Sequence, residues 1–170
     1  MKFNTDSSFV GLEKLKQAQA EQLAEFEAWA ARNLWENFHT SHFDWWMFPI
    51  NRSSAYGLAW TVYEGEIDAL KRDGRYLASY LRGVELVSAS WGWDVARAAP
   101  IPDLKAGQSW HFWPVRLFKA ALSVQLFGYA PLFDSLKTYA LGLAQRGERM
   151  EYNGHDLGWL FTGGVDPRIT

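Results

Sequence analysis

Apolar residues recur at helical spacing in several segments of this chain, and proline or glycine marks where those segments begin and end. The stretch 114–128 begins with a proline and ends with a glycine, and the stretch 131–147 is bounded in the same way. Proline favours the first position of a helix, and glycine readily adopts the left-handed conformation that ends one. Because only residues 129–130 connect the two stretches, we expect two helices that pack as an antiparallel pair.

Further segments place apolar residues on one helical face. We expect a long helix between Ser8 and about Phe38, with charged residues on its other face. A second helix begins at residues 61–64, which form a Thr-x-x-Glu capping box, and stops at the turn dipeptide 73–74. A third runs over residues 75–92 and ends at a glycine. We expect the second and third helices to pack as a hairpin.

No alternating run of apolar and polar residues competes with this helical pattern. The prolines of residues 93–108 predict a surface loop, and the glycines of residues 148–170 predict an irregular tail that docks on the helices. The tail residues expected to dock are Leu157, Trp159, Leu160 and Phe161. A chain of 170 residues suits one domain. We therefore expect an all-α fold, a single-domain bundle of five or six helices over residues 1–170 with an irregular C-terminal tail.

Composition narrows the classes of function. A formal net charge of −2 and a pI near 6.1 argue against nucleic acid as a partner, because binding to phosphate backbones needs a concentrated excess of Lys and Arg. The absence of cysteine excludes disulfides, thiolate metal sites and a cysteine nucleophile. The chain has no signal-like start and no apolar run of about 18 residues, so we expect a cytoplasmic protein with no membrane partner. No phosphate-binding loop, dinucleotide motif or serine elbow occurs, and we assign no cofactor and no catalytic residue.

Tryptophan is the outlier in this composition, with 10 among 170 residues. Two short aromatic clusters stand out, at residues 42–49 and 110–114. Aromatic side chains bury much apolar area and, in Trp, keep a polar N–H, so such clusters mark either the centre of a core or a lined pocket. We predict that the indole rings of Trp45, Trp46, Trp110 and Trp113 converge on one cleft.

Histidines lie in both aromatic clusters. His42 and His111 are candidates for a general base, although each can also pack or cap a helix. His39 and His42 are three apart and have Asp44 nearby, yet the spacing of a metalloprotease helix is missing. We therefore expect no metal site.

Charged residues at helical spacing accompany the clusters. Arg82 and Glu85 share one helical face, and Arg116 and Lys119 share another. An arginine set against indole rings would bind an anion in a partly dry cleft. The structural alternative is an Arg–Glu bridge that ties two helices together.

A series of motifs runs from His42 to Lys119. It comprises the segments 42–49, 66–71, 82–86, 91–92 and 111–119. This order resembles the conserved region of the opioid growth factor receptor family and its bacterial relatives, which have an H-x-Y-I-Q-W-L-F-P segment, a later E-L followed by an aromatic-Gly pair, and an R-I-L-K-S-L-like helix. An uncharacterised bacterial family has a similar S-H-W-x-W-x-x-F-P stretch. The resemblance implies an all-helical domain whose Trp/Phe-Pro segment is buried or lines a cleft, and it supplies no catalytic residues.

Three hypotheses about function remain open. The chain is a binding module whose aromatic cleft takes a small molecule or a peptide, or an enzyme that uses His42 or His111 as a general base beside an arginine anion anchor. Alternatively, the clusters are only core, and the chain is a structural domain that forms a homo-oligomer. The candidate ligand-binding residues are His42, Trp45, Trp46, Arg82, Glu85, Trp110, His111, Trp113, Arg116 and Lys119.

Overall fold

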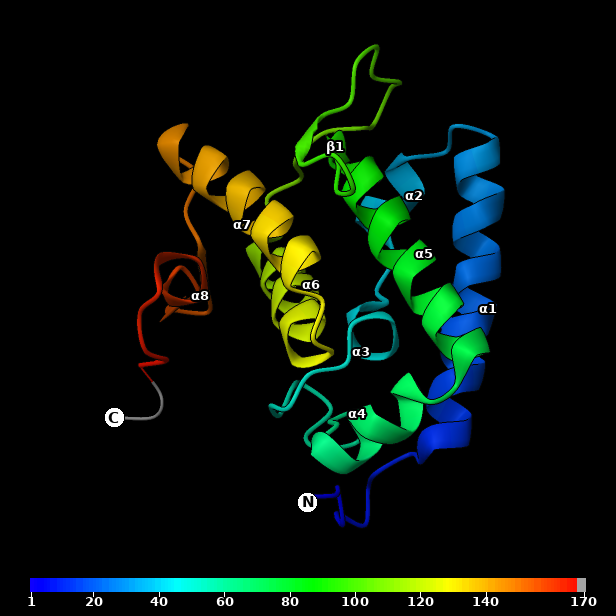
Figure 1. Cartoon of the computed structure of the whole chain (residues 1–170). Helices are drawn as coiled ribbons and strands as arrows, with labels where there is room; N and C mark the ends of the chain where they lie inside the picture. The colour runs from blue at the N-terminus through cyan, green and yellow to red at the C-terminus, as the bar shows by residue number, and fades with distance from the viewer. Residues whose placement is uncertain (168–170) are drawn as a thin grey trace.

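The computed structural model describes residues 1–167, and within this range the chain is predominantly helical (Figure 1). The helices are α1 (Leu12–Ala31), α2 (Glu36–Thr40), α3 (Asp44–Met47), α4 (Glu64–Lys71), α5 (Gly74–Ser90), α6 (Pro114–Leu126), α7 (Ala130–Gln145) and α8 (Trp159–Thr162). Two antiparallel two-residue hairpins complete the fold, β1 (Trp93–Asp94) with β2 (Ala99–Pro100) and β3 (Glu151–Tyr152) with β4 (His155–Asp156). The all-α, single-domain prediction is therefore confirmed.

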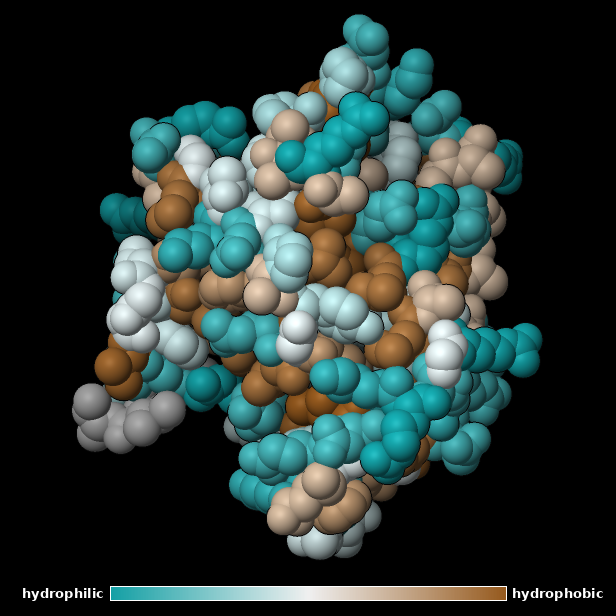
Figure 2. Space-filling model, in the orientation of Figure 1, coloured by the Kyte–Doolittle hydropathy of each residue, from teal (hydrophilic) through white to brown (hydrophobic). Residues whose placement is uncertain are grey.

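Two helix pairs form the body of the molecule. Helix α5 packs along α1, α7 packs along α6, and the short helix α3 contacts both α1 and α6 between the pairs (Figure 1). The predicted antiparallel arrangement of the Pro-initiated helices is thus confirmed as α6 and α7. Figure 2 shows hydrophobic residues in a band between α5 and the α6–α7 pair, with hydrophilic residues over α4. No helix within residues 1–167 is both long and apolar enough to cross a bilayer.

Aromatic rings from separate elements join in one hydrophobic core. Phe26 of α1 lies 4.7 Å, centroid to centroid, from both Phe38 of α2 and Phe43, and all three side chains are fully buried. At the other end of the core, Tyr80 of α5 stacks on Phe127, with ring centroids 4.5 Å apart. Such pairs add specific ring contacts to the burial of apolar area, and here they tie α1 to α2 and to the start of α3, and α5 to the end of α6.

The long first helix expected up to Phe38 is wrong, because α1 ends at Ala31. Asn33 adopts a left-handed backbone conformation with φ of 54°, which asparagine tolerates better than most residues. The break turns Trp35 into the core, where its ring stacks on Phe38 at 5.3 Å. Burial of this indole offsets the loss of helical hydrogen bonds at the break.

The predicted capping box at residues 61–64 is also wrong. The Thr61 hydroxyl donates to the Arg52 carbonyl oxygen at 2.9 Å, and α4 begins later. Its first turn is held by Glu66, whose carboxylate accepts from the backbone N–H groups of Tyr63 at 3.0 Å and Asn4 at 2.9 Å. Helix α4 lies across the end of α5, so the expected hairpin of these two helices is replaced by a corner (Figure 1).

The C-terminal tail docks on the helices, as predicted, but it is less irregular than expected. It forms the β3–β4 hairpin and the short helix α8. Leu157, Leu160 and Phe161 are buried, and Trp159 meets Phe118 of α6 edge to face at 5.7 Å. Residues 168–170 of the predicted tail lie outside the described residues.

Candidate functional site

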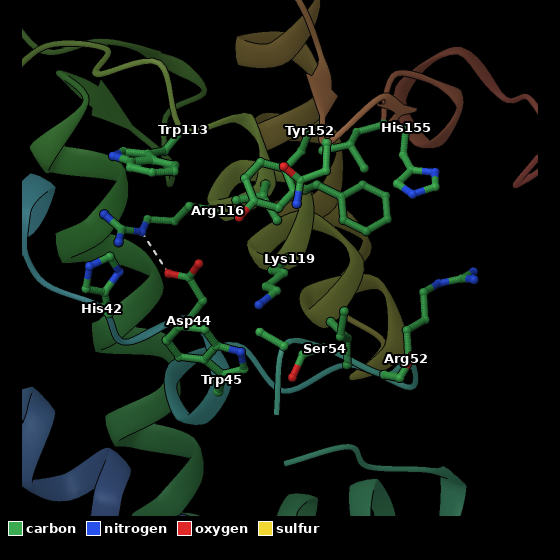
Figure 3. Close-up of a pocket in the computed structure, with 17 residues that line it drawn as sticks. His42, Asp44, Trp45, Arg52, Ser54, Trp113, Arg116, Lys119, Tyr152 and His155 are labelled. Atoms are coloured by element: carbon green, nitrogen blue, oxygen red, sulfur yellow. Dashed lines mark hydrogen bonds and ion pairs between the residues drawn. The ribbon is translucent and has the colours of Figure 1, made fainter. Parts of the chain in front are cut away.

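A cavity of about 360 Å³ opens between α3, the loop that follows it, the N-terminal half of α6 and the β3–β4 hairpin (Figure 3). The candidates His42, Trp45, Trp113, Arg116 and Lys119 all line it. Segments far apart in the sequence therefore form a single site, and the predicted convergence of the two aromatic clusters holds for Trp45 and Trp113. Buried neighbours of Trp45 in the first cluster, such as Phe43 and Met47, belong to the core instead.

Lys119 provides the amine of this cavity. Its side chain extends from α6 into the space above Trp45, and its Nζ lies 4.7 Å from the centroid of that ring (Figure 3). The residue is only 9% exposed, and its Nζ opens onto the cavity with no carboxylate or carbonyl of the described part of the chain within hydrogen-bonding or ion-pairing distance. Burial lowers the pKa of Lys119, and nearby Arg116 acts in the same direction while Asp44 opposes both.

Arg116 has its hydrogen-bonding groups directed at the protein. Its guanidinium donates to Asp44 Oδ1 at 2.8 Å and to the carbonyl oxygens of Phe38 at 2.7 Å and Ser41 at 2.6 Å, and it lies 4.1 Å above the Phe43 ring. These bonds hold α6 to α2, to α3 and to the segment between them. The role of anion anchor proposed for Arg116 is therefore better suited to Lys119, since Arg116 is already neutralised by Asp44.

Trp45 forms the floor of the cavity. Its Nε1 is buried and has no acceptor among the described residues. A side chamber of about 10 Å³ lies against Trp45, Ser54 and Lys119 and shares these residues with the main cavity. In Figure 3 the indole nitrogen of Trp45 and the amine of Lys119 both point toward the middle of the site. The site thus offers two donors, Trp45 Nε1 and Lys119 Nζ, for which residues 1–167 provide no acceptor.

Trp46 and Trp110 lie outside this cavity, contrary to the prediction of one shared cleft. Trp46 packs against Trp60 at 5.2 Å and donates to Gln22 of α1 at 3.2 Å. Trp110 packs against Trp91 at 6.0 Å and lines a second cavity of about 290 Å³. Neighbouring indoles of one cluster therefore face different surroundings.

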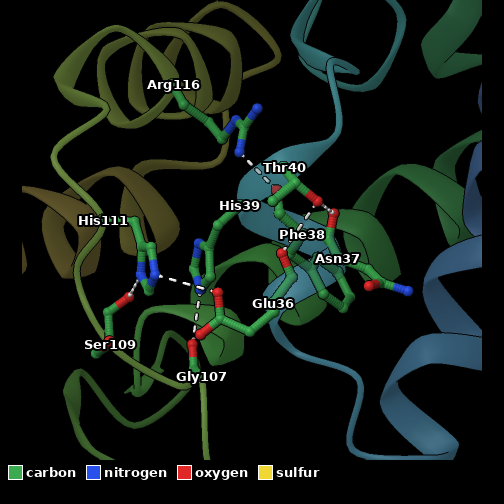
Figure 4. Close-up of polar contacts among 9 residues, drawn as sticks. All are labelled: Glu36, Asn37, Phe38, His39, Thr40, Gly107, Ser109, His111 and Arg116. Atoms are coloured by element: carbon green, nitrogen blue, oxygen red, sulfur yellow. Dashed lines mark hydrogen bonds and ion pairs between the residues drawn. The ribbon is translucent and has the colours of Figure 1, made fainter.

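His111 also lies away from the cavity. Its ring stacks on His39 with centroids 3.7 Å apart, and its Nε2 is 3.4 Å from a Glu36 carboxylate oxygen (Figure 4). The His39 ring in turn contacts the Gly107 carbonyl oxygen at 2.7 Å. This cluster links α2 to the loop before α6, so of the two general-base candidates only His42, which is exposed, lines the cavity.

Arg82 and Glu85 form a surface bridge. Arg82 donates to Glu27 of α1 at 2.7 Å and to Glu85 at 2.8 Å, and its side chain is 41% exposed. The pair lines none of the cavities described above, which favours the structural alternative, a bridge between α1 and α5. No group of three or more metal-ligating side chains is found in residues 1–167.

Several cavity residues come from segments that carried no sequence signal. Arg52 and Ser54 lie in the loop after α3, and Tyr152 and His155 lie in the β3–β4 hairpin (Figure 3). Arg52 pairs with Asp166, a buried residue of the tail. Short polar loops without periodicity give no indication of where they will lie, so only the tertiary structure places these residues at the site.

Comparisons with known proteins leave the resemblance to the opioid growth factor receptor family a prediction. No protein-family model, no curated protein and no solved structure matches this chain.

Proposed function

We propose that this protein is a small-molecule binding module and that the cavity beside Lys119 takes one small ligand with an apolar body. The observation that carries the proposal is the amine of Lys119, which opens onto an aromatic-walled space from a mostly buried side chain and has no acceptor among the described residues. A buried cation is costly when unpaired, whereas a ligand that supplies an acceptor offsets that cost. The site therefore resembles a binding pocket that presents one hydrogen-bond donor, the Lys119 ammonium, to a ligand.

Size and lining support a small molecule over a peptide. A volume of about 360 Å³ falls at the lower end of the range for small-molecule pockets, which are mostly apolar with a few convergent polar groups. Aromatic side chains at the rim remain accessible, with Trp113 39% and Tyr152 40% exposed. Tyr56, which is 56% exposed, meets Trp45 edge to face at 4.8 Å. An exposed aromatic rim around a concave site is typical of ligand binding.

Backbone strain beside Trp113, which lines the cavity, is consistent with this role. Phe112 has φ of 60° and is 70% exposed, next to Trp113 at the start of α6. A bulky residue in the left-handed region costs free energy, and such residues concentrate at functional sites. The proposal places the protein in the cytoplasm. It does not depend on whether the chain forms a homo-oligomer.

Indole N–H resonances provide a direct test. In ¹⁵N-labelled protein each tryptophan gives one such signal, which Trp→Phe variants assign. A screen of small aromatic acids, amides and alcohols should move the signals of Trp45 and Trp113. The signal of Trp93 should stay in place, because Trp93 does not line the cavity and its Nε1 already donates to Ser135 at 3.1 Å.

A cavity-blocking variant makes the screen specific. Ala55 is exposed and lines the cavity, so Ala55→Phe should weaken the ligand-induced shifts. Ala106 is exposed in another loop, and Ala106→Phe should leave them unchanged. Shifts that persist equally in both variants, or a screen that moves neither Trp45 nor Trp113, would contradict the proposed function.

A further inference from the structure

We infer that the cavity selects small monocarboxylic acids, with the carboxylate held between Lys119 Nζ and Trp45 Nε1 and the apolar body lying against Trp113. This inference rests on the proposed function and names its ligand class. It follows from the balance of charge, from the unmet donors and from the shape of the site.

Among the described residues that line the cavity, three are cationic, Arg52, Arg116 and Lys119, and the one carboxylate is that of Asp44. Arg116 is paired with Asp44, and Arg52 is paired with Asp166. Lys119 has no such partner among the described residues, so the site carries a surplus positive charge. Its attraction for an anion is strengthened by burial, because the effective dielectric constant falls away from bulk water. A ligand amine would meet repulsion at the same place.

A second hydrogen-bond donor at the site favours a ligand carboxylate over a halide ion or a single neutral acceptor. Trp45 Nε1 is buried without an acceptor among the described residues, and an unmet buried N–H costs about 1–3 kcal/mol. A carboxylate has two oxygens and accepts several hydrogen bonds, so it can serve the indole N–H and the ammonium together. Charge-assisted bonds of this kind are the stronger ones.

The side chamber fits this arrangement in size. Its volume of about 10 Å³, beside Trp45, Ser54 and Lys119, is about that needed for a single water or one ligand oxygen. The main cavity then takes the rest of the ligand. Exposed Trp113 and Tyr152 present ring faces and edges to that space, which suits a planar or aromatic body (Figure 3).

Calorimetric titration with three matched probes tests the ligand class. The probes are 3-phenylpropionate, its neutral amide 3-phenylpropanamide, and 3-phenylpropylamine. The wild-type chain should bind the acid more than about tenfold more tightly than the amide, as one charge-assisted contact allows, and should bind the amine most weakly.

Variants assign the preference to the named donors. Lys119→Met keeps the length and apolar character of the side chain but removes the cation, so the acid should lose its preference over the amide while the amide binds as before. Trp45→Phe removes the second donor and should weaken the acid by about threefold to tenfold. Lys105 is exposed in a loop away from the cavity, and Lys105→Met should change none of the affinities.

The outcomes separate this inference from the proposed function. Equal binding of acid and amide, or an acid preference that survives in Lys119→Met, overturns the carboxylate inference and leaves a small-molecule site. Failure of all three probes to bind overturns the carboxylate inference, and the proposed function is overturned as well only if the wider screen also leaves the Trp45 and Trp113 indole signals in place. Thermal unfolding of each variant verifies that it is folded, and Trp45→Phe supplies the test of donor use if Lys119→Met does not fold.

Discussion

Replacing Arg116 with methionine removes the cation that joins α6 to α2, to α3 and to the segment between them. In the wild-type chain this guanidinium donates to Asp44 and to the carbonyl oxygens of Phe38 and Ser41, all at 2.8 Å or less. The side chains of Arg116 and Asp44 are only 5% and 10% exposed. Methionine fills similar volume, so the change leaves a buried carboxylate and carbonyl oxygens without their donors.

The expected loss is about 3–5 kcal/mol in the free energy of unfolding, the usual effect of breaking a buried ion pair by removing one partner. This is a large part of the about 5–15 kcal/mol that stabilises a typical domain. The double variant Arg116→Met with Asp44→Asn removes the stranded charge as well. It should therefore lose less than the sum of the two single changes, by about 0.5–3 kcal/mol.

Urea denaturation followed by tryptophan fluorescence measures these losses, and Arg82→Met is the matched control. Arg82 also bonds two partners, Glu27 and Glu85, but its side chain is 41% exposed. Surface pairs contribute little, so this control should lose less than about 1 kcal/mol. If Arg116→Met were no more destabilising than Arg82→Met, the reasoning from burial would be refuted.

Three further predictions concern stability. The Ser123 hydroxyl lies 2.8 Å from both the Tyr80 hydroxyl and a backbone carbonyl oxygen. In urea titrations Ser123→Ala should therefore lower the free energy of unfolding by about 1–3 kcal/mol, and by more than Tyr80→Phe does. Equal losses would argue against this chain of hydrogen bonds. At Gly107, φ is 87° and a Cβ would lie 3.0 Å from a backbone nitrogen of α2. Gly107→Ala should therefore lower the midpoint of thermal unfolding by several degrees, and an unchanged midpoint would count against this close approach. Burial lowers the pKa of His39, partly offset by its bond to the Gly107 carbonyl, so the unfolded chain takes up the proton first and stability should fall as the pH drops below about 6.5. Urea midpoints at about pH 7.5 and 5.5 should show a smaller loss in His39→Gln, and identical losses would refute this assignment.

The sequence predicts correctly those helix ends that proline and glycine determine by their own backbone preferences. Pro114 and Gly128 bound α6 as expected, because their backbone preferences act without help from the rest of the chain. The break after α1 depends instead on burying Trp35 against Phe38, a tertiary contact. The apolar spacing continues through Asn33, so the sequence alone favoured one continuous helix.

The site was only partly predictable for a related reason. Composition drew attention to the two aromatic clusters, and Trp45 and Trp113 do meet at the cavity. Sequence cannot tell which of two adjacent indoles faces the core and which faces a cavity, so it predicts the same surroundings for Trp45 and Trp46. Tyr152 and His155 reach the site only because the tail folds back, a long-range arrangement that no local pattern encodes.

A crystal structure of the chain soaked with 3-phenylpropionate tests directly whether the cavity beside Lys119 binds a small ligand. We expect ligand density in the cavity, with a carboxylate oxygen about 3 Å from Lys119 Nζ and its phenyl ring beside Trp113. Ligand density that appears only elsewhere on the protein, or a cavity filled by ordered water alone at saturating ligand, would contradict the central claim that this cavity is a binding site.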